Sequence, residues 1–132
     1  MNRIILSGLL TALAVGSVAA GAFGASLKMV TVKGQLLDMN CYSALGAKGR
    51  THGRTCGKKC LRSGAPAGIL VHGKAWILDA NPRPLAPYVG MMIEVMGKCD
   101  ANDHMLLPTM IKVDDHGKWK TIKLKPLFKP VE

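Results

Sequence analysis

Apolar and polar residues alternate along residues 29–37, with Val30, Val32 and Leu36 on one side and polar residues on the other. This period of two, carried partly by β-branched side chains, predicts a β-strand. Gly34 lies in the middle of the stretch and indicates a bulge or a sharp bend in the strand.

The same kind of pattern predicts five more strands in the second half of the chain. Two apolar runs about Gly73 predict a hairpin, and residues 85–88 are expected to form one turn before the next strand. Alternation in that next strand points Cys99 inward, and Pro108 predicts an edge or a bulge in the strand that follows. Regularly spaced lysines in the last stretch are typical of an exposed edge strand. The five strands cover residues 67–72, 74–80, 91–99, 105–113 and 118–125.

Residues 38–68 interrupt this pattern and have no sustained period. Serine and glycine residues across 42–55 predict a long loop. Thr55 is expected to cap a helix of about two turns over residues 56–62, which Gly64 ends. Because helices this short are marginal on their own, a bound metal, a disulfide or packing on the sheet must stabilise it.

Five to six short strands with one short helix predict a mainly β fold, a small barrel. Over residues 29–113 the order of elements resembles the oligonucleotide- and oligosaccharide-binding (OB) barrels. We therefore expect a single OB-like domain over residues 26–125, with a cysteine-containing insertion at 38–68 and a flexible tail at 126–132. A chain of this size is enough for one small domain and not for two.

Residues 1–25 have the pattern of a signal peptide. Arg3 gives a positive start, residues 4–20 are uncharged and mainly apolar, and small residues follow. This predicts export and cleavage, and hence a periplasmic or secreted protein. The alternative is a retained membrane anchor, for which the apolar run is at the short end of the usual length.

Basic residues outnumber acidic residues throughout the chain. The sequence has 18 Lys and Arg against 8 Asp and Glu, a formal net charge of +10. Such an excess favours a solvated surface, or weak attraction to an anionic surface or partner protein, over a specific anion site. Nucleic acid is not an expected partner for an exported protein.

Three of the four cysteines fall in the 38–68 insertion, among six basic residues. They form the pattern D-x-x-C, then C-x-x-x-C, then G-x-P-x-G, which resembles a group of small bacterial exported proteins with an OB-like sheet. This resemblance implies no particular activity. Cys99 is an addition to the three-cysteine set of that group.

The spacing of the clustered cysteines suggests a metal site. Cys56 and Cys60 are four residues apart, so on a helix their Cβ atoms lie about 5–6 Å apart, wider than the roughly 3.5–4.5 Å of a disulfide. A metal with bonds of about 2.3 Å to each sulfur bridges that gap. Cys41 supplies a third soft ligand and His52 is the candidate fourth, a set that suits zinc or copper as Cu⁺.

A disulfide is the competing interpretation. An oxidising compartment permits one, and Cys41 joined to Cys56 or Cys60 would close a loop and stabilise the fold by about 3 kcal/mol. The protein would then be a stapled OB-like scaffold that binds a protein, glycan or lipid through a basic face. Sulfur atoms about 4 Å apart favour the metal, whereas one pair at about 2 Å favours the staple.

Other chemistry has little support in the sequence, so we expect a non-enzymatic binding module. No C-x-x-C-H motif for haem and no phosphate-cradling glycine loop for a nucleotide occurs. Asp38 has no recognisable second carboxylate partner, and we expect it to form hydrogen bonds at the end of a strand. Arg54, Lys58 and Lys59 are expected to lower the thiol pKa values, which would suit thiol redox chemistry. The C-x-x-C motif and the parallel sheet usual for that chemistry are absent from the pattern.

Overall fold

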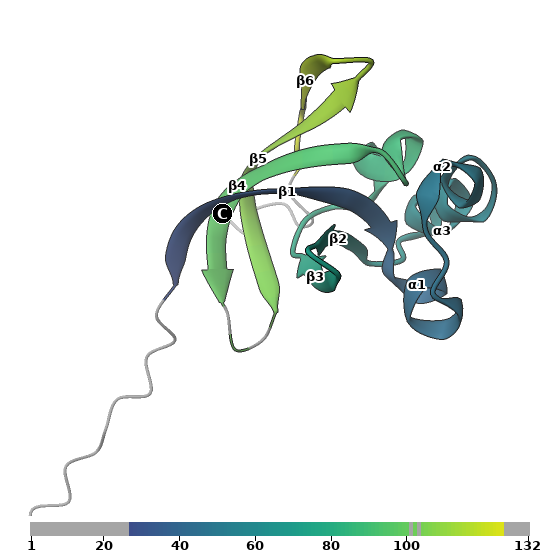
Figure 1. Ribbon diagram of the computed structural model, residues 1–132, viewed down its shortest axis with the longest axis horizontal. Coiled ribbons are helices and arrows are strands. Elements are labelled where there is room, and N and C mark those ends of the chain that lie inside the picture. The colour runs from purple at the N-terminus through teal and green to yellow at the C-terminus, as the bar shows by residue number, and fades with distance from the viewer. Residues whose placement is uncertain (1–26, 101, 103, 126–132) are drawn as a thin grey trace, which may run out of the picture.

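The computed structural model describes residues 27–100, 102 and 104–125 (Figure 1). The predicted signal peptide at 1–25 and the predicted tail at 126–132 lie outside these residues. Across the described part of the chain, no helix has both the length and the apolar character needed to span a membrane.

Six strands form one sheet that closes on itself. Its order is β3-β2-β1-β4-β5-β6, and a parallel pairing between β3 and β5 joins the two sides into a ring of five strands. β6 extends this ring as a further strand beside β5. The strands are β1 (Lys28–Asp38), β2 (Ala67–Val71), β3 (Lys74–Leu78), β4 (Met92–Asp100), β5 (Met105–Asp115) and β6 (Lys118–Ile122). The predicted mainly β, OB-like barrel is confirmed.

β1 is the strand that organises the ring, because it pairs with two different neighbours. Its first part is antiparallel to β4, from Lys28 to Gln35, and its last part is antiparallel to β2, from Gln35 to Asp38. Gly34 lies at this change of partner, where a Cβ atom would overlap the carbonyl oxygen of Leu70. The strand curves over the barrel (Figure 1), and it delivers Asp38 to the end of the molecule that holds the helices.

The second half of the sheet follows the predicted pattern closely. The β4–β5 pairing shifts register between Met96 and Gly97, opposite Pro108, which is the irregularity that the proline predicted. Ile93 is fully buried, and Cys99 packs half-buried against the core, as the alternation indicated. With five apolar residues from neighbouring strands, Cys99 lines a cavity of about 170 Å³ inside the barrel.

The insertion between β1 and β2 is helical along most of its length. It contains α1 (Met39–Leu45), α2 (Gly49–His52), η1 (Gly53–Gly57), which is a π-helical turn, and α3 (Lys58–Ser63). The last three follow one another without a break, and a 3₁₀-helix, η2 (Arg83–Tyr88), precedes β4. The prediction of a long loop over residues 42–55 was therefore wrong, and the predicted helix over 56–62 begins earlier, at Gly49.

Close packing explains why a glycine-rich stretch is helical here. A Cβ atom at Gly53 would overlap the carbonyl oxygen of Val89, and one at Gly90 would overlap the backbone of Gly49. The Arg50 guanidinium donates to the carbonyl oxygen of Val89 at 3.0 Å. These glycines allow the helix to lie directly on the segment that joins η2 to β4. Gly53 serves packing alone, whereas Gly49 and Gly90 also have positive φ values, 85° and 81°, which favour glycine.

Capping also differs from the expectation. Thr55 does not cap a helix, because its hydroxyl bonds back to the carbonyl oxygens of Thr51 and His52, each 3.2 Å away. Asp38 is the N-cap of α1, and its Oδ1 accepts a hydrogen bond from the backbone N–H of Asn40 at 3.0 Å. A capping aspartate at the end of β1 therefore starts the first helix of the insertion.

Candidate metal centre

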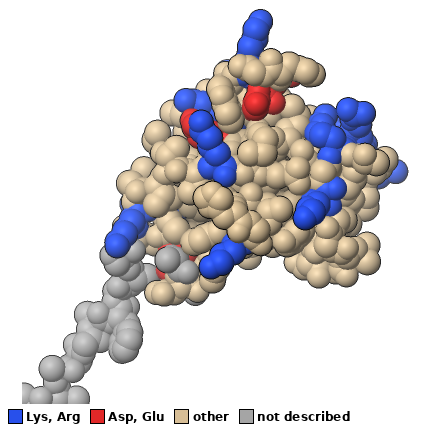
Figure 2. Space-filling view, viewed as in Figure 1, with Lys and Arg blue, Asp and Glu red and all other residues tan. Residues whose placement is uncertain are grey.

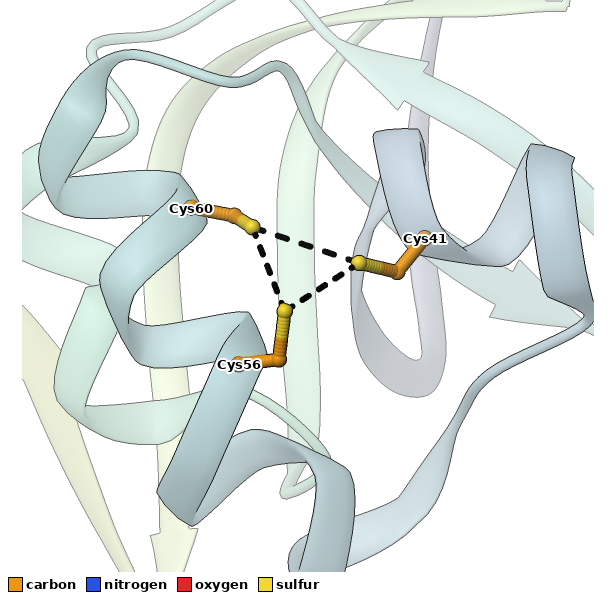
Figure 3. A group of neighbouring side chains, drawn as sticks. All are labelled: Cys41, Cys56 and Cys60. Atoms are coloured by element: carbon orange, nitrogen blue, oxygen red, sulfur yellow. Dashed lines mark hydrogen bonds between the residues drawn. The ribbon is translucent and has the colours of Figure 1, made fainter.

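Two separate segments bring three cysteine side chains together. Cys41 lies in α1, directly after β1, while Cys56 lies in η1 and Cys60 in α3 on the facing helix. Figure 3 shows the three sulfur atoms pointing toward one another across the gap between these segments. The Sγ–Sγ distances are 3.5 Å for Cys41–Cys56, 3.6 Å for Cys56–Cys60 and 3.9 Å for Cys41–Cys60.

These distances are those of co-ligands and not of bonded sulfur atoms. A disulfide requires about 2.05 Å between its sulfurs. Two thiolates on one tetrahedral zinc, each with a bond of about 2.3 Å, lie about 3.8 Å apart. All four cysteines of the chain are free thiols in the structure. The near-equilateral triangle could therefore hold a single ion at its centre.

A second group lies beside the triangle and shares Cys41 with it. It consists of Asp38, Cys41 and His52, whose potential ligand atoms all lie within 4.8 Å of one another. The Asp38 side chain is fully buried, and the His52 side chain is 14% exposed. Their Oδ2 and Nε2 atoms are 3.4 Å apart, and neither atom has a hydrogen-bond partner.

No family model, curated protein or solved structure matches this chain. The meaning of the site therefore rests on its own geometry and chemistry.

Each residue that the sequence singled out for a metal has a clear place in this geometry. Cys41, Cys56 and Cys60 form one group, and His52 forms the other with Cys41 and Asp38. The sequence analysis gave Asp38 only a hydrogen-bonding role, which its Oδ1 does perform as the helix cap. The signal for a further role is the D-x-x-C spacing, because an N-cap residue and the residue three positions later lie at the same end of a helix.

The pKa values of Cys41 and Cys60 are raised, contrary to what the sequence suggested. The nearby Asp38 carboxylate is the largest cause that raises the pKa of Cys41 well above its usual range, followed by the neighbouring Cys56 thiol. Burial is the largest cause that raises the pKa of Cys60. The expectation that basic neighbours lower these pKa values is wrong for both residues. Arg54 and Lys59 are exposed to solvent, which screens their charges, whereas Asp38 is buried.

The centre is open to solvent on one side. Cys56 is exposed, while Cys41 and Cys60 are half-buried. A shallow cavity beside Cys60 is also lined by Lys59 and Asn40. An ion held by the three sulfurs would therefore be accessible from solution.

Proposed function

We propose that this protein is an exported, non-enzymatic binding module in which Cys41, Cys56 and Cys60 hold one soft metal ion, zinc or copper, with His52 as a fourth ligand. The observation that carries this proposal is the triangle of sulfur atoms, 3.5–3.9 Å apart, drawn from two segments of the chain. Thiolates favour Zn²⁺ and Cu⁺ over harder ions. The exported location rests on the signal-peptide pattern of residues 1–25.

The fold supports the proposal because it fixes the ligands before any ion arrives. Cys41 follows a capped helix start at the end of β1, and the helix with Cys56 and Cys60 lies on the η2–β4 segment through its glycines. An ion would join the two segments. Since the pKa values of Cys41 and Cys60 are raised in the metal-free protein, binding through these thiolates would also release protons, as it does at other thiolate sites.

Elemental analysis of the mature protein, prepared without exposure to air, tests the proposal. We expect about one ion of zinc or copper per chain in the wild type and a loss of most of it in Cys41→Ser, Cys56→Ser and Cys60→Ser. Cys99→Ser is the matched control, because Cys99 lines the barrel cavity away from the three sulfurs. A metal content below about 0.2 per chain, with the three thiols oxidised, would overturn the proposal.

A disulfide-stapled scaffold is the second candidate, in which Cys41 and Cys56, whose sulfurs form the closest pair at 3.5 Å, would be joined. A small movement would allow these atoms to bond under oxidising conditions. The protein would then bind a protein, glycan, lipid or other anionic surface through its basic residues, which are spread across the face in Figure 2 from the β6 hairpin to the helices. Thiol counting by mass spectrometry separates the candidates: no free thiol in the native protein favours the scaffold, whereas three or four favour the metal site.

A further inference from the structure

Asp38 is the one buried charged side chain among the described residues. Only one of its two carboxylate oxygens has a hydrogen-bond partner. Oδ1 accepts the capping hydrogen bond from Asn40, but Oδ2 is enclosed and has no hydrogen-bond partner. A buried carboxylate is costly unless it is paired with a cation or coordinates a metal. A positive charge beside Oδ2 would therefore stabilise the Asp38 carboxylate.

The distance from Asp38 to His52 indicates what kind of charge that is. Oδ2 and Nε2 are 3.4 Å apart, longer than the roughly 2.7–3.2 Å of an N–H···O hydrogen bond. An oxygen and a nitrogen ligand on one tetrahedral zinc, with bonds of about 2.0–2.2 Å, lie about 3.3–3.5 Å apart. The separation is longer than that of a hydrogen bond and equals that of two co-ligands of one ion, or of an ion pair in which His52 is protonated.

Both side chains are held in place by the fold. The capping hydrogen bond fixes the Asp38 carboxylate, so Oδ2 is directed by the same contact that starts α1. The ring of His52 lies over Gly57, where an added Cβ atom would come within 3.3 Å of its Nε2 and Cδ2 atoms. Both side chains therefore border Cys41, the residue that the two groups of potential ligands share.

We propose that Asp38 and His52 face the bound ion from the side of Cys41 and make the site selective for Zn²⁺ over Cu⁺. This inference rests on the proposed function, because it concerns the same site. The expected selectivity follows from the charge of the ligands and from their type. Three thiolates and a carboxylate bring four negative charges, which a divalent ion offsets better than a monovalent one. Carboxylate is an ordinary ligand of zinc beside sulfur and imidazole, whereas Cu⁺ favours the soft sulfur ligands.

Competitive metal titration of the reduced, metal-free protein tests this selectivity. Zn²⁺ and Cu⁺ are each titrated against a chelator of known affinity, in the wild type, Asp38→Asn and His52→Gln. Asparagine keeps the oxygen that caps α1 but replaces Oδ2 with a group that does not bind metals. We expect the Zn²⁺ affinity of both variants to fall about 10- to 100-fold, and the Cu⁺ affinity to change by less than about threefold.

Asp79→Asn is the matched control, because it removes an exposed carboxylate that follows β3. It is expected to bind both ions as the wild type does. Should Asp38→Asn lose its native circular dichroism, His52→Gln decides the question, since His52 makes no side-chain cap hydrogen bond in the helix.

The possible results separate this inference from the proposed function. A wild type that binds neither ion would overturn both. A wild type that binds Zn²⁺, with variants that bind it equally tightly, would overturn only the role of Asp38 and His52. Variants that lose Zn²⁺ and Cu⁺ affinity to the same extent would likewise show that these residues do not set selectivity.

Discussion

Cys41 is the residue on which the chemistry of the centre depends, because it belongs to both groups of potential ligands. Its sulfur lies 3.5 Å from the sulfur of Cys56 and 3.9 Å from that of Cys60, and the nearby Asp38 carboxylate raises its pKa. Without an ion, the carboxylate and the thiolate would repel each other, so the thiol keeps its proton. With an ion between them, the short distance between the carboxylate and the thiolate would instead allow both groups to bind the ion.

The raised thiol pKa predicts a pH dependence for the stability of the metal-free protein. In the unfolded chain a cysteine titrates near pH 8.5, whereas the folded state holds the Cys41 proton to higher pH. As pH rises through the unfolded value, the unfolded state loses its proton first, so the free energy of unfolding falls. Urea denaturation of the reduced, metal-free protein between pH 7 and 10 measures this.

Cys41→Ser is the comparison for this pH dependence. It removes the thiol with the raised pKa, so its free energy of unfolding should fall less steeply over the same range. Parallel curves for the wild type and the variant would contradict the structural assignment of the raised pKa to Cys41 and its contact with Asp38.

At the level of elements, the position of the centre depends on how closely one helix lies on the barrel. The α2–η1–α3 helix lies against Val89 and Gly90 through residues that lack a side chain at the contact. The π-helical turn η1 sits at this contact and contains Cys56. Such turns are rare and are often found at functional sites.

Gly53→Ala is predicted to disturb both the fold and the centre. The added methyl group would overlap the carbonyl oxygen of Val89 at a fully packed contact. We expect a loss of about 1–3 kcal/mol in the free energy of unfolding, measured by urea denaturation, together with weaker metal binding. Ser43→Ala, an exposed change in α1, should alter stability by less than about 0.5 kcal/mol. Equal stability of the wild type and Gly53→Ala would show that this contact is looser than the structure indicates.

The strands could be predicted from the sequence, whereas the helices of the insertion could not. A period of two is a local property, so it identified β1, β4 and the hairpin about Gly73 directly. Gly53 suggested a turn, because glycine serves both for turns and for close approach, and only its contact at Val89 distinguishes the two uses. The partner lies more than thirty residues away in the chain.

The sequence predicted some residues of the candidate site and missed the further role of one. The three cysteines were identified from their spacing, since sulfur ligands are few and distinctive. Asp38 was assigned to hydrogen bonding, because a strand-end aspartate is usually a cap, and here it is one. Its second oxygen is directed into the site only because β1 and α1 meet at that point, which local sequence does not reveal.

In the whole molecule, the hydrophobic core and the candidate metal centre are separate. The core lies between the strands of the closed sheet and includes fully buried residues from β1, β4 and β5. Leu61 of α3 and Leu85 of η2 also belong to it, so the insertion is attached to the barrel by apolar contacts as well as by any ion. The fold therefore does not depend on the centre for its core.

Metal removal is predicted to lower stability without unfolding the barrel. Small zinc domains that lack a core unfold when the ion is removed, because the ion supplies their folding free energy. Here Leu36, Ile93 and Ile111 are fully buried in the strands, so the sheet should persist in excess chelator. We expect the far-ultraviolet circular dichroism of the strands to remain while the thermal midpoint falls. The midpoint should recover as Zn²⁺ is added back, rising with the logarithm of the free Zn²⁺ concentration once this exceeds the dissociation constant. The Cys56→Ser variant should already have the lower midpoint and should not respond to Zn²⁺. Collapse of the strand signal on chelation would mean that the ion, and not the apolar core, holds the barrel together.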